Sequence, residues 1–313
     1  MKKDWIWFAG LALCIVLIIP WSILHWEKKK SSEIGIQIRV LMPGGDVERI
    51  PLEKYLIGVV AGEMPANFEV EALKAQAITA RTYAIKQVIK NKSNDKSYDV
   101  DTTVQTQVWL SEQMMRKKWG WLNYWRYYRK LESAVKETSG LVLVYHDEYI
   151  DAYYHSSSGR KPTEKAEEVW SMSRPYLQNV NSEEDNPLRY VKKFSFSPQE
   201  ISMILGIKET IDHLSPKDFS ILAKTAAGRA KTVRVLGKVY PASQLRMKLG
   251  LSSTDIEWAI QPKQLTITAY GNGHAVGMSQ WGANNLAQKG MKVEAILNHY
   301  YPGTKISMIK QNK

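Results

Sequence analysis

The chain begins with a long apolar run. Residues 5–26 carry no charged side chain, although charged residues flank the run at both ends. As a helix that rises about 1.5 Å per residue, such a run crosses the ~30 Å hydrocarbon layer of a bilayer. The run ends in Ile23-Leu24-His25-Trp26 and lacks the small residues of a signal-peptide cleavage site. This pattern predicts a single-pass anchor within residues 1–30, followed by one large region, residues 31–313. Basic residues flank both ends of the run, so charge alone does not fix its orientation. The chemistry considered below predicts that residues 31–313 are extracytoplasmic.

Strand and helix patterns follow one another along the rest of the chain. Apolar residues alternate with polar ones over residues 34–40, which predicts a strand. They recur at i, i+3, i+4, i+7 and i+8 over residues 51–63, which predicts a helix. Further helices are expected over residues 71–90 and from about residue 279, with strands over 142–145, 149–154 and 265–270 and on both sides of Gly237. Separate helices and hairpins of this kind predict an α+β fold with a substrate cleft, not a parallel doubly wound sheet.

Residues 109–137 form an unusual segment that is rich in Trp, Tyr, Lys and Arg. Its second half is predicted to be helical. Aromatic faces can stack on sugar rings, which would place this segment along a cleft. A helix that buries its aromatic side chains in the core explains the same composition, so both interpretations remain open.

The charge distribution and the cysteine content limit which partners and metal sites the sequence predicts. The net charge of +12 comes from dispersed residues, and no basic motif with base-stacking spacing stands out, so nucleic acid is not a predicted partner. Anionic wall polymers and lipid headgroups fit the charge better. The chain has a single cysteine, Cys14, which lies inside the apolar run. The region after the anchor therefore has no disulfide framework and no thiolate metal ligand.

Glu63 is the first candidate for chemistry. The apolar stripe of residues 51–63, continued to i+11, ends on this residue, where an ionised carboxylate is costly unless it is paired or protonated. Burial raises a carboxyl pKa, and a carboxyl protonated near neutral pH can act as a general acid. Alternatively, Glu63 points to solvent from the last helical turn, or meets Lys74 or Arg81. These two cations are seven residues apart on one helical stripe, and they would hold substrate oxygens if that stripe faces Glu63.

A glycine-rich loop, residues 271–282, is the second candidate. It joins a strand to a helix, and its glycines would let His274 and Gln280 present polar groups to a ligand. Its G-x-G-x-x-x-G spacing does not match the dinucleotide fingerprint. Residues 154–159 lack the G-x-S-x-G elbow of a serine nucleophile, and no H-x-x-x-H or H-E-x-x-H spacing predicts a metal site. We therefore predict neither a cofactor nor a metal.

Several ordered motifs resemble one family. The segments 60–65, 71–77 and 80–84 resemble the opening signature of the stage II sporulation protein D family, and 273–283 and 299–304 resemble its closing signature. The resemblance implies a lytic transglycosylase that cuts peptidoglycan glycan strands during forespore engulfment, outside the mother-cell membrane. It implies that Glu63 is the catalytic glutamate. It also implies a set of supporting residues in the cleft, namely Lys74, Arg81, Tyr176 and Asp185, while the second motif contributes His274, Ser279 and Gln280.

The resemblance also implies partners. These are stage II sporulation proteins M and P, the second an amidase that strips stem peptides so that peptide-free glycan reaches the enzyme. Some members of the family carry zinc on cysteine and histidine ligands. This chain has serines around Ser158 instead, so the zinc site is not expected here.

Three activities remain open. A hydrolase normally uses two carboxylates, whereas a lytic transglycosylase manages with one. The sequence offers Glu63 and no obvious second carboxyl, which favours the transglycosylase, although Glu69, Glu71 or Asp101 could approach in space. The third possibility is a non-catalytic wall-binding module that stimulates a partner amidase, a role suggested by the related name amidase enhancer.

Overall fold

The structure is a computed structural model that describes residues 35–310, apart from 95 and 208–210. Within this part of the chain, no helix is both long enough and apolar enough to span a bilayer. The predicted anchor lies outside the described residues.

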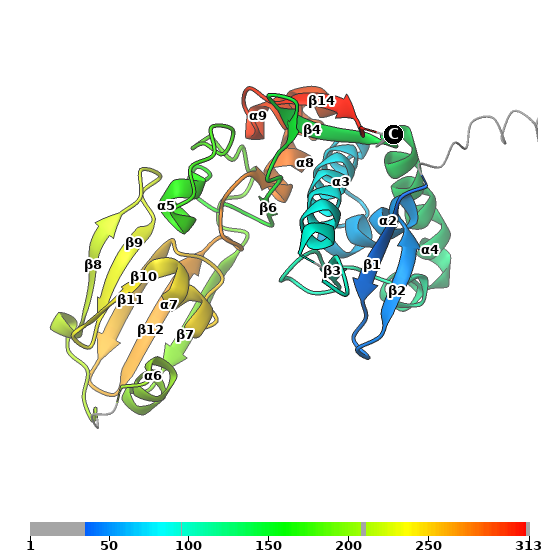
Figure 1. The fold of residues 1–313 in the computed structure, drawn as a ribbon. Helices are drawn as coiled ribbons and strands as arrows, with labels where there is room; N and C mark the ends of the chain where they lie inside the picture. Colours follow the sequence, from blue (N-terminus) through cyan, green and yellow to red (C-terminus); the bar gives the residue numbers. More distant parts are fainter. Residues whose placement is uncertain (1–34, 95, 208–210, 311–313) are drawn as a thin grey trace, which may run out of the picture.

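Two lobes stand side by side, each around its own apolar core (Figure 1). The large lobe combines the N-terminal half of the chain with its C-terminal end. Its elements are β1 (Gln37–Leu41), β2 (Val47–Pro51), α2 (Leu52–Glu63), α3 (Val70–Ser93), β3 (Val100–Asp101), α4 (Glu112–Glu137), β4 (Leu141–Tyr145), β5 (Glu148–Tyr149), β6 (Tyr154–His155), α5 (Ala166–Trp170), β13 (Met278–Ser279), α8 (Gln280–Gln288), α9 (Val293–Tyr300) and β14 (Lys305–Met308).

The small lobe is built from the intervening chain. Its elements are β7 (Val191–Phe196), α6 (Pro198–Leu205), the 3₁₀ turn η1 (Pro216–Asp218), β8 (Phe219–Lys224), β9 (Ala230–Val235), β10 (Lys238–Pro241), α7 (Ala242–Lys248), β11 (Ile256–Gln261) and β12 (Gln264–Tyr270). The chain leaves and re-enters the large lobe at one place, because the amide of Gly271 donates to the carbonyl oxygen of Tyr190 at 2.8 Å.

Most strand pairs are antiparallel, as the α+β prediction requires. The described three-stranded sheets have the orders β2-β1-β3 and β14-β4-β5 in the large lobe, and β10-β9-β8 and β11-β12-β7 in the small lobe. Only short contacts are parallel among these elements, between β1 and β3 and between β6 and β13. The α+β prediction is therefore confirmed for the described residues.

The helices of the large lobe pack through small and apolar faces. In α2, the predicted stripe is buried, with Tyr55, Leu56, Val59 and Val60 in the core. The α3 helix presents a row of buried alanines, and their small side chains let α2 and α8 approach its backbone closely. This packing brings the C-terminal end of α2 next to the first residues of α8.

Two local predictions differ from the structure. Helix α4 begins at Glu112, so the segment is helical through nearly its whole length and not in its second half alone. Gly120, at φ 69°, bends it into two helical pieces, a break that the periodicity hides. The second strand of the predicted 142–154 hairpin is short, because only Glu148–Tyr149 pairs with β4, while Tyr154–His155 pairs with β13.

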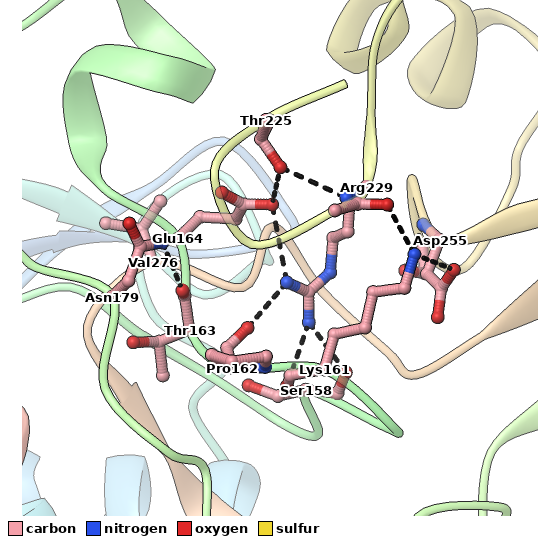
Figure 2. A network of polar contacts seen from close by, with 12 residues as sticks. Ser158, Lys161, Pro162, Thr163, Glu164, Asn179, Thr225, Arg229, Asp255 and Val276 are labelled. Carbon is pink, nitrogen blue, oxygen red and sulfur yellow. Dashed lines mark hydrogen bonds and ion pairs between the residues drawn. The ribbon is translucent and has the colours of Figure 1, made fainter. Parts of the chain in front are cut away.

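A buried ion pair joins the two lobes (Figure 2). The guanidinium of Arg229, from the small lobe, is fully buried and lies 3.3 Å from Glu164 of the large lobe. It also donates to the carbonyl oxygens of Ser158 at 2.7 Å and Pro162 at 2.6 Å, and Thr225 donates to Glu164 at 2.7 Å. The charges thus compensate each other where no water reaches them. The pair fixes the segment of residues 158–164 against the small lobe.

Candidate active site

A cleft of about 790 Å³ lies between the two lobes. The large lobe supplies most of its wall, from the end of α2, the loop before α4, the strand β6 and the glycine loop before α8. The small lobe supplies α7 and the turn that follows it. The lining residues used below are Glu63, Val108, Tyr154, Trp170, Arg246, His274 and Gln280.

Glu63 is the last residue of α2, and its carboxyl faces this cleft, as the helical stripe predicts. Oε1 accepts a hydrogen bond from the amide of Val108 at 2.7 Å, and Oε2 accepts one from Nε2 of Gln280 at 3.4 Å. Burial raises the pKa of Glu63 above its usual 4.5, although the hydrogen bonds from Val108, Gln280 and Tyr154 oppose this shift. The site therefore favours a protonated carboxyl held in a fixed orientation.

Glycine makes the approach of Val108 possible. A side-chain carbon at Gly62 would lie 2.5 Å from the carbonyl oxygen of Val108, closer than carbon and oxygen can come. Because Gly62 has no such carbon, the backbone of the loop can press against the end of α2. The amide of Val108 then reaches the carboxyl of Glu63, so the residue before the acid helps to orient it.

The start of α8 supplies the second contact to Glu63. Ser279 caps this helix by accepting from the amide of Gly282 at 3.2 Å, and Gln280 follows as the first helical residue. The side-chain nitrogen Nε2 of Gln280 lies 3.4 Å from Oε2 of Glu63 and 3.4 Å from Oε1 of Gln76 in α3. Gln280 is thus brought to the predicted acid from more than 200 residues away in the chain. Ser279 is buried behind it and donates to Glu184 at 2.8 Å.

Two histidines lie near one end of the cleft. The ring of His274 lies 4.9 Å from that of Trp170 and 5.8 Å from that of His155. Burial lowers the pKa of His274 to about 3, so its imidazole is neutral. His155 contacts the carbonyl oxygen of Val276 through Nδ1 at 3.2 Å, so Nδ1 carries the proton and Nε2 accepts from Ser158 at 2.6 Å. Ser158 is buried and lies outside the lining of the cleft, which gives no support to a serine nucleophile.

The remaining predicted residues lie away from the cleft lining. Arg81 is fully buried and pairs with Glu53 at 2.5 Å, while Lys74 pairs with Glu137 at 2.8 Å on the surface. The hydroxyl of Tyr176 accepts from the amide of Asp151 at 3.0 Å, and the exposed Asp185 pairs with Arg189 at 3.0 Å. The stripe of Lys74 and Arg81 therefore does not face Glu63 in this structure.

The structure adds residues that the sequence reading missed. Glu184 accepts from Ser157 at 2.5 Å, from Ser279 at 2.8 Å and from the amide of Ser158 at 2.5 Å. It therefore joins the loop after β6 to the start of α8, behind the cleft. Arg246 reaches the cleft from the small lobe and Trp170 from α5. No sequence motif marked either residue, because only the tertiary fold brings them into the same cleft as Glu63.

The aromatic segment does not line this cleft. Trp121 and Trp125 of α4 are exposed, at 78% and 53%, while Tyr124 is buried in the core. None of these residues belongs to the lining of the Glu63 cleft. Part of the segment thus packs in the core and part faces solvent.

The zinc site of some family members does not fit these side chains. Across residues 35–310, with the gaps noted above, no group of three His, Cys, Asp or Glu side chains is placed to hold a metal ion. Both ring nitrogens of His155 already form hydrogen bonds, one with the carbonyl oxygen of Val276 and one with the hydroxyl of Ser158. The described residues include no cysteine that could supply a thiolate ligand. We therefore derive no chemistry through a metal.

The fold and the cleft define a two-lobed α+β protein in which Glu63 is the sole carboxylate among the described residues of the cleft lining. The chain belongs to the stage II sporulation protein D family, a family of sporulation proteins. The family model matches residues 44–145. The chain is 39% identical to stage II sporulation protein D of Bacillus subtilis (strain 168), over 90% of this chain and 81% of the relative. It is 40% identical to the same-named protein of Bacillus amyloliquefaciens, over 83% of this chain and 75% of the relative. An amidase enhancer of Bacillus subtilis (strain 168) is 30% identical, over 80% of this chain and 40% of the relative.

Proposed function

We propose that this protein is a lytic transglycosylase that cleaves peptidoglycan glycan strands between N-acetylmuramic acid and N-acetylglucosamine, with Glu63 as its catalytic acid and base. The observation that carries the proposal is the carboxyl of Glu63, whose pKa is raised by burial in the cleft. Among the described residues that line the cleft, Glu63 is the sole carboxylate. A hydrolase of the usual kind would need a second one.

The other candidate carboxylates are engaged elsewhere. Glu71 pairs with Lys74 at 3.1 Å and accepts from the amide of Val293 at 2.9 Å. Asp101 accepts from Thr103 at 2.7 Å, and Glu69 is exposed at the start of α3. None of them lines the cleft. This arrangement supports the scheme with a single acid.

The reaction balances with one carboxyl. Glu63 donates its proton to the bridging oxygen as the bond from the muramic acid anomeric carbon to that oxygen breaks. The 6-hydroxyl of the same sugar then attacks the anomeric carbon and gives its proton back to the Glu63 carboxylate. The product is a 1,6-anhydro ring, and no water is consumed. The amides of Val108 and Gln280 hold the carboxyl through both transfers.

The setting of this activity is part of the proposal. The apolar run of residues 5–26 would anchor the chain in the engulfing membrane of the mother cell, with residues 31–313 outside it. The sporulation proteins M and P would be its partners, and peptide-stripped strands would be its substrate. The support is the family membership together with the cleft between the two lobes.

The proposal is tested by identifying the sugar at the glycan ends that cleavage creates. The purified full-length protein, incubated with peptide-stripped glycan strands, is expected to release fragments with 1,6-anhydromuramyl ends, identified by mass spectrometry. Reducing muramyl ends would instead indicate hydrolysis. The absence of both kinds of end would reject strand cleavage altogether.

The pH dependence should follow Glu63. Because burial raises its pKa, the protonated form that can donate a proton persists to higher pH than for an exposed glutamate. The kcat/KM for strand cleavage is therefore expected to fall as pH rises through this raised pKa. His274, whose pKa is lowered to about 3, stays neutral over the same range and adds no limb. A descending limb centred at or below 4.5, the usual glutamate value, would contradict this assignment.

A second function is favoured by one comparison, the relative named amidase enhancer. In that case the cleft would bind glycan and stimulate a partner amidase without cutting the strand. The two functions differ in their dependence on the acid. Binding that persists in Glu63→Ala, together with no cleavage by the unmodified protein, would favour the enhancer.

A further inference from the structure

Arg246 is a cation in the cleft without a carboxylate partner. It lies on α7 of the small lobe and lines the same cavity as Glu63. Its Nε donates to the carbonyl oxygen of Ser252 at 3.3 Å. No carboxylate of the described residues forms an ion pair with it, and its guanidinium is partly withdrawn from water. Burial accordingly lowers the pKa of Arg246.

Arg81 and Arg229, whose side chains are fully buried among the described residues, show what Arg246 lacks. Arg81 meets Glu53 at 2.5 Å, and Arg229 meets Glu164 at 3.3 Å. Each of these charges is compensated inside the protein. Arg246 has only a neutral carbonyl, although a partly buried, unpaired charge is costly. An anionic group supplied by a ligand would complete this site.

Among the described residues that line the cleft, no other side chain is positively charged at neutral pH, and no carboxylate neutralises Arg246. Glu63 carries no charge in its protonated form, and the two histidines are held neutral by burial. The remaining lining is apolar or neutral and polar, including Tyr154, Trp170 and Gln280. The cleft therefore offers an acid from the large lobe and a single cation from the small lobe.

We propose that Arg246 binds the lactyl carboxylate of N-acetylmuramic acid and so selects glycan strands from which the stem peptide has been removed. A strand that carries stem peptides has a neutral amide in that position. A free lactyl carboxylate matches the planar guanidinium and forms charge-assisted hydrogen bonds with it. This inference rests on the proposed function and adds the substituent that the cleft recognises.

The test compares two forms of one polymer. Peptide-stripped strands with free lactyl carboxylates are set against the same strands after carbodiimide coupling to ammonia, which turns each carboxylate into a carboxamide. The unmodified protein is expected to lose about ten- to a hundredfold in kcat/KM on the amidated strands, the usual cost of a lost charged hydrogen bond. Arg246→Gln is expected to cleave both forms at the same reduced rate. Arg246→Lys, which keeps the charge, should keep part of the preference.

Arg234→Gln is the matched control. Arg234 is an exposed arginine on β9 of the same lobe, outside the cleft lining, so this variant should prefer free carboxylates as strongly as the unmodified protein does. If Arg246→Gln instead loses the same factor on both polymers and keeps the preference, Arg246 does not read the lactyl group. That result would leave strand cleavage by Glu63 intact.

A binding measurement separates the two proposals. In a Glu63→Gln background, calorimetry with short strands reports affinity without turnover. Tighter binding of the free carboxylate form, lost on adding Arg246→Gln, would support the anion site even if no strand is ever cut. Equal affinity for both forms would overturn the anion site, whatever the outcome for cleavage.

Discussion

Glu63→Gln is expected to lower the rate of glycan-strand cleavage by about 10²–10⁴-fold, the usual contribution of a general acid. Glutamine keeps the shape of the side chain, so its carbonyl oxygen can still accept from the amide of Val108. It cannot donate a proton to the bridging oxygen. The measurement is the release of anhydromuramyl ends by mass spectrometry, with circular dichroism to verify that the fold is retained.

Glu69→Gln is the control for this experiment. Glu69 lies a few residues further along the chain, is exposed and does not line the cleft, so its cleavage rate should match that of the unmodified protein. Undiminished cleavage by a folded Glu63→Gln variant would move the acid role to another residue. The descending pH limb should also vanish in Glu63→Gln, since the group that titrates has gone.

Arg229→Met is expected to lower the free energy of unfolding by about 3–5 kcal/mol, because it leaves Glu164 buried without its cation. Glu164 is 1% exposed, and burial already raises its pKa even with Arg229 present. Methionine fills similar space but cannot replace the hydrogen bonds to the carbonyl oxygens of Ser158 and Pro162. Chemical denaturation monitored by tryptophan fluorescence measures the loss.

A double-variant cycle isolates the ion pair in this second experiment. Replacing both partners, in Arg229→Met with Glu164→Leu, removes the unpaired charge and should cost clearly less than the sum of the single changes. Arg234→Met, an exposed arginine on the same lobe, should change stability by less than about 0.5 kcal/mol. Additive losses in the cycle would show that the pair contributes no coupling between the lobes.

Local pattern predicted much of the fold. The stripe of α2, the alanine-rich α3, the hairpin around Gly237 and the helix after the glycine loop all lie where periodicity and turn residues place them. Each depends on residues close in sequence. The pairing of β6 with β13 was missed because it joins segments more than 120 residues apart, and the kink at Gly120 was missed because apolar periodicity does not register a single glycine at positive φ. The separation of the apolar residues into two cores likewise has no local signal.

The site shows the same division between local and distant information. The inward direction of Glu63 follows from its helical position, and Gln280 follows from its glycine-rich loop. The places of Lys74 and Arg81 could not be deduced, because a shared helical stripe does not say what the stripe faces. Arg246 belongs to no recognisable sequence motif, and its position in the cleft is evident only from the tertiary structure.

The small lobe interrupts the large one at a single junction. The amide of Gly271 bonds to Tyr190, and Val191 pairs with Tyr270, so the two connecting strands run side by side. A unit whose ends meet in this way can be exchanged without rerouting the host chain. The matched family segment, residues 44–145, lies wholly in the host. Glu63, the proposed acid, thus lies in the host part of the chain, and Arg246, the proposed anion site, lies in the inserted lobe. The two proposed roles can therefore be altered separately, by changing one lobe and leaving the other intact.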